Sequence, residues 1–229
     1  MDDGSLARLA AMTEAAGGNS AALVAAAAHA RSAGPGAAAV VLVEGMSDQS
    51  ALATLAVRRG RNLVGEGVFI VPMGGATNIG HFLAVFGPRG FGVRLAGLCD
   101  QGEEHDVRRG LARAGLYPGP ASPGPASPGP ASPGLARLGF FVCVADLEDE
   151  LIRALGVAVT EQLIEGQGEL GPFRTFVKQP AQRTRPREQQ IRRFLGTRSG
   201  RKIHYGQVLA GALDLSRVPR PLDAVLAHV

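Results

Sequence analysis

The chain has 229 residues, of which 45% are hydrophobic and 19% are charged. This composition excludes a chain that is disordered throughout, because it supplies enough apolar side chains for one sizeable core. Aromatic residues make up only 5% and tryptophan is absent, so we do not expect a stacking surface for single-stranded bases. The formal net charge is +4, but it is unevenly distributed along the chain.

The first 36 residues are rich in alanine and end in the turn sequence Gly34-Pro35-Gly36, which predicts a helical lead-in over residues 1–36. The longest apolar runs, such as 21–28 and 37–43, are shorter than the roughly 20 residues that span a bilayer. Asp2 and Asp3 stand where a secretory signal carries positive charge. We therefore expect a cytoplasmic protein without a membrane span.

Three units of a strand followed by a helix come next. Each begins with an apolar run of strand length, and each continues with apolar residues at helical spacing, as Leu52 and Leu55 are after the N-cap candidate Ser47. The predicted pairs are 37–43 with 47–59, 68–71 with 77–86, and 93–99 with 107–116.

A repeat separates the third unit from the fourth. Residues 118–134 contain three copies of Pro-Gly-Pro-Ala-Ser, which removes backbone donors and buries nothing, so we predict a solvated loop inserted in the domain. Residues 138–144 then predict a fourth strand, and residues 147–155 a helix with an acidic first turn. Strands that alternate with helices in this way predict a mostly parallel sheet with helices on both faces.

The carboxy-terminal part is basic. Strand signals fade after residue 155, so we predict a mainly helical extension over residues 156–229. Residues 174–202 hold ten basic residues against one acid, Glu188, whereas the rest of the chain is net negative. Such a concentration of charge favours binding to a nucleic acid, because each neutralised phosphate releases counterions. A solvated arginine-rich face is the alternative. The candidate nucleic-acid-binding residues are Arg183, Arg185, Arg187, Arg192, Arg193, Arg198 and Arg201.

Acidic residues follow three of the predicted strands. Glu44 comes after the first, Asp100 after the third, and Asp146 with Glu148 after the fourth, while Asp48 lies one helical turn beyond Glu44. The carboxyl ends of parallel strands meet at one crevice, where converging carboxylates repel unless cations neutralise them. Donor sets of oxygen alone favour Mg²⁺ or Mn²⁺ over zinc. For Asp48 and Glu148, a favourable interaction with the helix dipole is the alternative.

The two cysteines do not suggest a metal site. Cys99 and Cys143 each lie in an apolar strand-like run, so we expect two buried thiols rather than a disulfide or a zinc site.

The acidic motifs resemble those of a known family. Val41 to Asp48 (VLVEGMSD) resembles the first motif of the TOPRIM domain, and Leu98 to Asp100 resembles the second. Further matches at 71–75, at 78–79 and at 146–150 make the segment 37–155 most similar to the TOPRIM domain of the OLD (overcoming lysogenization defect) family of nucleases. This resemblance implies a Rossmann-like α/β fold with a central, mostly parallel sheet.

The resemblance also implies metal-dependent cleavage of phosphodiester bonds. Glu44 would act in acid/base chemistry or in metal binding, with one or two Mg²⁺ or Mn²⁺ ions as cofactors. The usual Asp-x-Asp motif is replaced here by Asp100-Gln101-Gly102, so the missing ligand would be Glu104 or Glu103. The candidate metal ligands are Glu44, Asp48, Asp100, Glu104 and Glu148, of which Glu148 would serve a second ion. Lys202 resembles the late basic residue that steadies the scissile phosphate, which makes Glu44 and Lys202 the candidate catalytic residues.

The OLD nucleases carry an ATPase domain ahead of the TOPRIM domain, and this sequence has no Gly-x-x-x-x-Gly-Lys-Ser/Thr phosphate loop. Any ATP dependence would come from a separate ATPase partner. We expect a stand-alone TOPRIM protein that acts on DNA as an endonuclease or nickase. The alternative is a catalytically weak TOPRIM module that binds nucleic acid or a partner ATPase. Whether the protein forms a homodimer stays open.

Overall fold

The computed structural model describes residues 20–33, 39–117 and 133–229. Most of the predicted lead-in and nearly all of the proline-glycine repeat lie outside the described residues. Among the described residues, no helix combines the length and the apolar character that a bilayer crossing needs.

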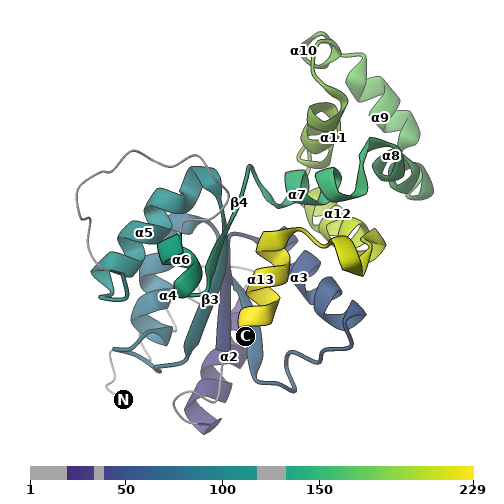
Figure 1. The fold of residues 1–229 in the computed structure, drawn as a ribbon. Coiled ribbons are helices and arrows are strands. Elements are labelled where there is room, and N and C mark those ends of the chain that lie inside the picture. The colour runs from purple at the N-terminus through teal and green to yellow at the C-terminus, as the bar shows by residue number, and fades with distance from the viewer. Residues whose placement is uncertain (1–19, 34–38, 118–132) are drawn as a thin grey trace.

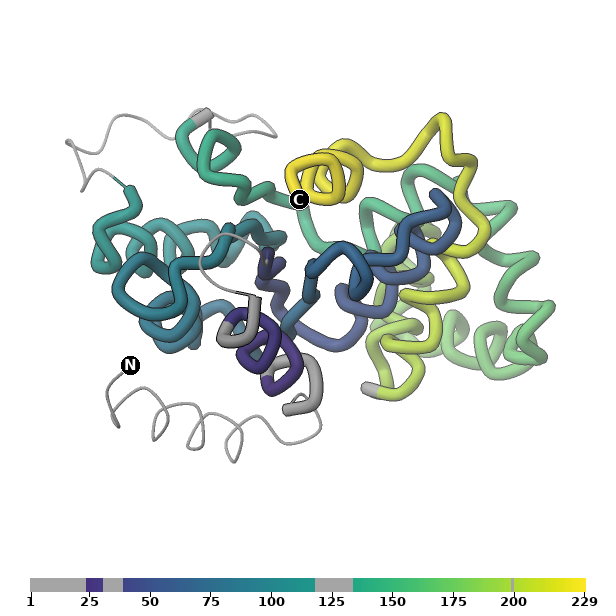
Figure 2. Tube along the Cα trace, turned by 90° about the horizontal axis from the view of Figure 1, so that it is seen from below, coloured from purple at the N-terminus to yellow at the C-terminus, as the bar shows by residue number. Residues whose placement is uncertain are grey.

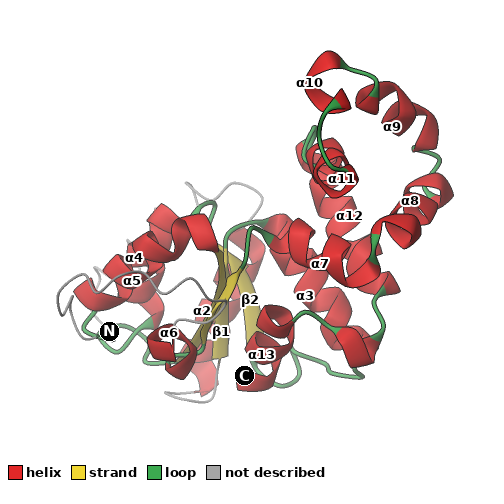
Figure 3. Cartoon of the chain, turned by 45° about the horizontal axis from the view of Figure 1, so that its top comes forward, coloured by secondary structure: helices red, strands yellow, loops and turns green. Residues whose placement is uncertain are grey.

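Four parallel strands form the central sheet in the order β2-β1-β3-β4 (Figures 1 and 3). The strands are β1 (Ala39–Val43), β2 (Val68–Pro72), β3 (Arg94–Asp100) and β4 (Phe140–Cys143). Every residue of β1 and β2 is buried, as their continuous apolar sequences require in a parallel sheet covered on both faces. The register sets Val41 opposite Ile70 and Ala96. The predicted Rossmann-like α/β fold is confirmed.

One face of the sheet is covered by helices that lie between residues 20 and 137. They are α2 (Ser20–Ala33), α4 (Ile79–Phe86), α5 (Glu104–Arg113) and the short α6 (Pro133–Arg137), with the 3-10 turns η2 (Ala76–Asn78) and η3 (Gln101–Glu103) before α4 and α5. Val40 and Leu42 of β1 pack there with Phe86 and Leu111 in one buried core. Cys99 belongs to this core.

The other face is covered by α3, by the helix that follows β4, and by two helices from the end of the chain. They are α3 (Met46–Arg58), α7 (Leu147–Leu155), α12 (Ser199–Ala212) and α13 (Arg220–His228), with η4 (Leu215–Arg217) between the last two. Val41 and Val43 of β1 share a core with Leu52 of α3 and Leu209 of α12. Cys143 lies in this second core, so the two cysteines are buried free thiols on opposite faces of the sheet, as predicted.

Four helices between α7 and α12 form an arm that projects from the sheet (Figure 1). They are α8 (Val157–Gly166), α9 (Leu170–Val177), α10 (Pro180–Arg183) and α11 (Arg187–Leu195), and we call residues 157–195 the arm. The ring of Phe194 lies 5.1 Å from that of Phe173 and 5.7 Å from that of Phe176, between centroids. These rings continue into the arm the apolar core that covers this face of the sheet. Figure 2 shows the arm and the α4–α5 pair at opposite ends of the molecule.

A buried glycine lets α12 approach α3 closely. A Cβ atom at Gly206 would lie 2.7 Å from the carbonyl oxygen of Ser47, which belongs to the first turn of α3. At Gly211, five residues further along α12, a Cβ atom would meet only a methyl group of Thr54, at 3.9 Å. The position of α12 against α3 therefore depends on Gly206.

We expect Gly206→Ala to destabilise the protein by about 1–3 kcal/mol, because the added methyl group forces α12 away from α3. Gly211→Ala is the matched control, and it should stabilise the protein by up to about 1 kcal/mol through helix propensity alone. Urea unfolding measures both effects. Equal stabilities for the two variants would contradict the close packing of α12 on α3.

Candidate functional site

The backbone of Glu44 is fixed by the turn that follows β2. The carbonyl oxygen of Glu44 accepts hydrogen bonds from the N–H groups of Gly74, at 2.9 Å, and Gly75, at 3.2 Å. Both glycines have positive φ, of 70° and 121°, which side chains disfavour. The Asn78 side chain closes the turn by donating to the carbonyl oxygen of Met73 at 3.0 Å. This turn therefore positions the first residue beyond β1.

Asp48 lies beside Glu44, in the first turn of α3. One of its carboxylate oxygens accepts a hydrogen bond from the N–H of Gly45 at 2.9 Å, and the residue is only 7% exposed. Burial raises the pKa of Asp48 to about 6, and the nearby charge of Glu44 acts in the same direction. The Gly45 N–H and the charge of Lys202 oppose this rise in part.

Three acids converge at the carboxyl end of β1 and β3. Asp100 ends β3, and η3 turns the chain so that the Glu103 carboxylate comes back toward it. One oxygen each from Glu44, Asp100 and Glu103 lie within 4.8 Å of one another, which is a spacing that could hold a metal ion. We call these three residues the acidic triad.

The electrostatics of the acidic triad favour a cation. Burial, followed by the charges of Asp48 and Glu44, raises the pKa of Asp100 to about 8. The pKa of Glu103 is also raised, first by burial and then by Glu44, and one of its oxygens is buried without a hydrogen-bond partner in the described part of the chain. A cation would relieve both the repulsion and the unsatisfied oxygen.

A second acidic position lies where α7 meets α12. Glu148 is 1% exposed, and neither of its carboxylate oxygens accepts a hydrogen bond from the described residues. The Lys202 Nζ atom of α12 lies 3.3 Å from one of these oxygens. Burial raises the pKa of Glu148 to about 7, although Lys202 acts against this rise. Lys202, Glu44 and Asp48 also line one cavity of about 240 Å³.

Glu104 lies outside the acidic triad. It forms an ion pair with Arg108, one turn along α5, at 2.6 Å. Glu103, which the sequence offered as the alternative ligand, is the residue that approaches Glu44 and Asp100. The spacing alone did not decide between the two residues, because the choice depends on where the 3-10 turn after β3 ends and α5 begins.

Asp146 has a structural position at the start of α7. One carboxylate oxygen caps the helix by accepting from the N–H of Asp149 at 2.8 Å, and the other pairs with Arg192 of the arm at 2.6 Å. Asp146 thereby orients the helix that carries Glu148.

The structure divides the predicted nucleic-acid-binding residues into two groups. Arg187, Arg192 and Arg201 are held in ion pairs with Glu161, Asp146 and Glu169, respectively. The other four are exposed and have no acidic partner among the described residues: Arg183, Arg185, Arg193 and Arg198. We call these four the unpaired arginines.

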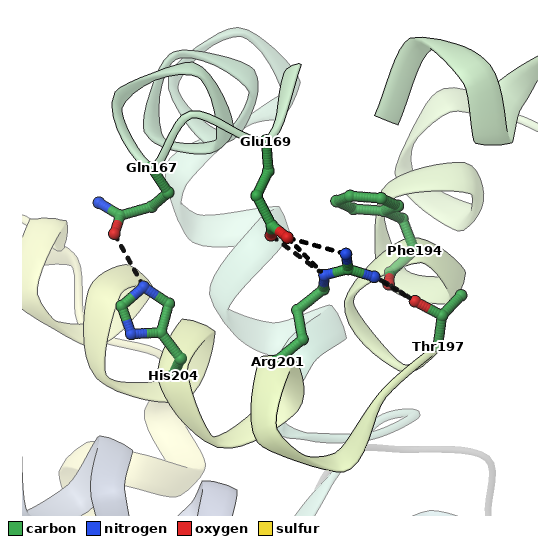
Figure 4. A network of polar contacts seen from close by, with 6 residues as sticks. All are labelled: Gln167, Glu169, Phe194, Thr197, Arg201 and His204. Atoms are coloured by element: carbon green, nitrogen blue, oxygen red, sulfur yellow. Dashed lines mark hydrogen bonds and ion pairs between the residues drawn. The ribbon is translucent and has the colours of Figure 1, made fainter. Parts of the chain in front are cut away.

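Arg201 fixes the base of the arm (Figure 4). Its guanidinium donates to both carboxylate oxygens of Glu169, at 2.8–3.0 Å, and it lies 4.2 Å from the ring centroid of Phe194. It also contacts Thr197 after α11. Arg201 is thus mostly occupied in joining α12 to the arm.

Comparisons with known proteins agree with this geometry. Residues 37–101 match the family model described as the overcoming lysogenization defect protein-like TOPRIM domain, which confirms the resemblance for that segment. No curated protein matches the chain in sequence. The sequence motifs of the first and third strands lie within the matched segment.

Solved structures of the C-terminal regions of OLD proteins are similar to most of this chain. The C-terminal region of the Xanthomonas campestris pv. campestris OLD protein is 22% identical with a TM-score of 0.62, and the match covers 83% of this chain and 91% of that one. The C-terminal region of the Burkholderia pseudomallei OLD protein is 18% identical with a TM-score of 0.60, over 84% of this chain and 96% of that one. At these identities the similarity bears on the fold alone.

The raised pKa values predict that metal-free protein loses stability as the pH rises. The pKa values of Asp48, Glu148 and Asp100 rise on folding from 3.8, 4.5 and 3.8 to about 6, 7 and 8. The folded state therefore binds more protons than the unfolded state between about pH 4 and pH 8, and its stability falls across this range. Urea unfolding in EDTA at pH 5 and pH 8 measures the fall.

The variant Asp100→Asn/Glu148→Gln is the control, because it removes the two carboxyl groups whose pKa values are raised furthest and should flatten the dependence. Mn²⁺ should stabilise the wild-type protein more at pH 8 than at pH 5, since protons compete with the metal for the carboxylates. A wild-type dependence as flat as that of the variant would contradict the electrostatic description of the site.

Proposed function

Because residues 37–101 carry an OLD-like TOPRIM domain, we propose that the protein hydrolyses phosphodiester bonds in DNA as an endonuclease or nickase, with Mg²⁺ or Mn²⁺ as cofactor. The observation that carries this proposal is the acidic triad, with its oxygens within 4.8 Å of one another. A donor set of oxygen alone fits Mg²⁺ or Mn²⁺. The buried oxygens of Glu103 and Glu148 that accept no hydrogen bond from the described residues also fit positions that a cation completes.

Each side chain has a role in this proposal. The acidic triad holds one ion, and Glu148 with Asp48 holds a second. A bound divalent cation polarises a phosphate oxygen and lowers the pKa of the attacking water. Lys202 lies in the same cavity as Glu44, where its ammonium group can donate to a non-bridging phosphate oxygen. Glu44 would then accept and return protons beside the reacting phosphate.

A nicking assay on supercoiled plasmid tests the proposal. Wild-type protein should nick the plasmid in Mg²⁺ or Mn²⁺ and not in EDTA. Glu44→Gln should lower the rate by about 100-fold or more, because it removes a proton-transferring metal ligand. Nicking at the wild-type rate by folded Glu44→Gln protein would contradict the assignment of Glu44.

A matched pair of variants identifies the ligand that replaces the second aspartate. Glu103→Gln should impair nicking, because Glu103 belongs to the acidic triad. Glu104→Gln should have little effect, because Glu104 pairs with Arg108 on α5. Impaired nicking by Glu104→Gln and normal nicking by Glu103→Gln would instead assign the metal-ligand role to Glu104.

The second candidate function is binding to nucleic acid or to a partner ATPase without catalysis. It is favoured by the sequence Asp100-Gln101-Gly102, which lacks the second aspartate of the usual motif. DNA binding without metal-dependent nicking by the wild-type protein would support this alternative over the nuclease.

We also propose that the unpaired arginines bind the DNA backbone. Arg187 is less suited to this role, because it pairs with Glu161 and its guanidinium lies 4.8 Å from the ring centroid of Phe173. The exposed guanidinium groups of Arg183 and Arg185 are bound only to backbone carbonyl groups in the described structure, which leaves their charges uncompensated.

The variant Arg183→Ala/Arg185→Ala should weaken DNA binding for all sequences and flatten the slope of log affinity against log salt by about 2, since each phosphate contact contributes roughly −0.9. Fluorescence polarisation in Ca²⁺, measured from low to moderate salt, gives this slope. The control Arg94→Ala/Arg137→Ala removes the same charge from the opposite end of the strands. Equal effects from the two double variants would contradict a binding surface on the arm.

A further inference from the structure

Glu148 has an unusual environment for a buried carboxylate. Such groups are ordinarily satisfied by several hydrogen bonds, yet neither Glu148 oxygen accepts one from the described residues. The side chain of Glu148 is 2% exposed, and its one ion-pair partner in the described structure is Lys202, at 3.3 Å. The charge of Glu148 therefore depends on a single, long contact.

Lys202 serves more than one carboxylate of the site. It lines the cavity that Glu44 and Asp48 also line, and its side chain is 38% exposed, so the ammonium group has access to that cavity. Although burial opposes it, the charges of Glu148, Asp48 and Glu44 raise the pKa of Lys202 above its ordinary value. A cation is thus already present where the acids of α3 and α7 face each other.

The neighbouring residue shows how a permanent ion pair is built in the same helix. Arg201 binds Glu169 through two nitrogen atoms, and its side chain is 10% exposed. A guanidinium fork holds a carboxylate with two directed hydrogen bonds, whereas an ammonium group on a flexible stem is a point charge that can swing away. The chain has 22 arginines and only two lysines, Lys178 and Lys202. The buried carboxylate of Glu148 is therefore paired with a lysine, whose ammonium group can be displaced more easily than a guanidinium group.

We infer that Lys202 is an exchangeable counter-ion of Glu148: it neutralises the carboxylate in the metal-free protein, and a divalent cation bound by Glu148 and Asp48 displaces it. This inference rests on the proposed function. The displaced ammonium group stays in the cavity, because Gly206 one turn later keeps α12 packed against α3. Metal binding at Glu148 thereby releases the lysine to bind a phosphate group of the substrate.

Mn²⁺ titration calorimetry tests the exchange without any activity measurement. Lys202→Met should raise the affinity for one of two ions by about tenfold or more, since it removes the cation that competes for Glu148. Lys202→Arg keeps the charge but binds the carboxylate more firmly, so it should lower that affinity. Lys178→Met is the control for loss of a lysine and should change neither ion.

The same measurement in a Glu148→Gln background separates exchange from general electrostatics. Lys202→Met should then have little effect, because the carboxylate for which the two cations compete is gone, and this double variant also avoids an unpaired buried charge. An equal gain in affinity with and without Glu148 would overturn the inference, as would unchanged affinity in both Lys202 variants. Absence of Mn²⁺ binding in every protein would overturn the proposed metal site itself.

Lysine NMR gives an independent readout. After reductive methylation with ¹³C-formaldehyde, the two lysines give two side-chain signals, and Lys178 serves as the internal reference. The Lys202 signal should shift on addition of Mg²⁺, toward the position that it has in metal-free Glu148→Gln protein. A Lys202 signal that stays at its metal-free position in saturating Mg²⁺ would overturn the inference.

Discussion

Repulsion among buried and half-buried carboxylates is the constraint on which the candidate site depends. Parallel strands end at one edge of the sheet, so the residues that follow β1 and β3 converge there. Burial and the nearby acids hold the pKa values of Asp48, Asp100 and Glu148 well above their ordinary range. The apolar cores on both faces of the sheet stabilise the fold against this cost. A fold that retains such a cluster is suited to binding cations at that edge.

The sheet could be predicted because its strands are short apolar runs bounded by turn residues. All four predicted strands end within two residues of the observed ends. The alternation of strands and helices also predicted where the acids lie. Glu44 and Asp100 follow neighbouring parallel strands, so the topology alone brings them to one edge of the sheet. The choice between Glu103 and Glu104 needed the structure, because it depends on where the 3-10 turn after β3 gives way to α5.

The basic segment shows why composition alone could not define a binding surface. Local charge density is high, but Arg187, Arg192 and Arg201 pair with acids that lie 26 to 46 residues away in sequence. Ion pairs between residues so far apart in the sequence depend on how the arm packs against α7 and α12. They cannot be predicted from the local sequence. The structure therefore separates arginines that hold the arm in place from those whose charge remains available to a polyanion.

Helix α12 connects these two groups of interactions. Arg201 fixes the helix to the base of the arm, and Gly206 fixes it against α3, with Lys202 between them. All three residues lie on the same helix of 14 residues, so the arm, the cavity and α3 are joined through one element. The flexible stem of Lys202 places its ammonium group near Glu148 and beside the cavity that Glu44 and Asp48 line. If the arm binds DNA as proposed, substrate contact and charge compensation at Glu148 would both involve α12.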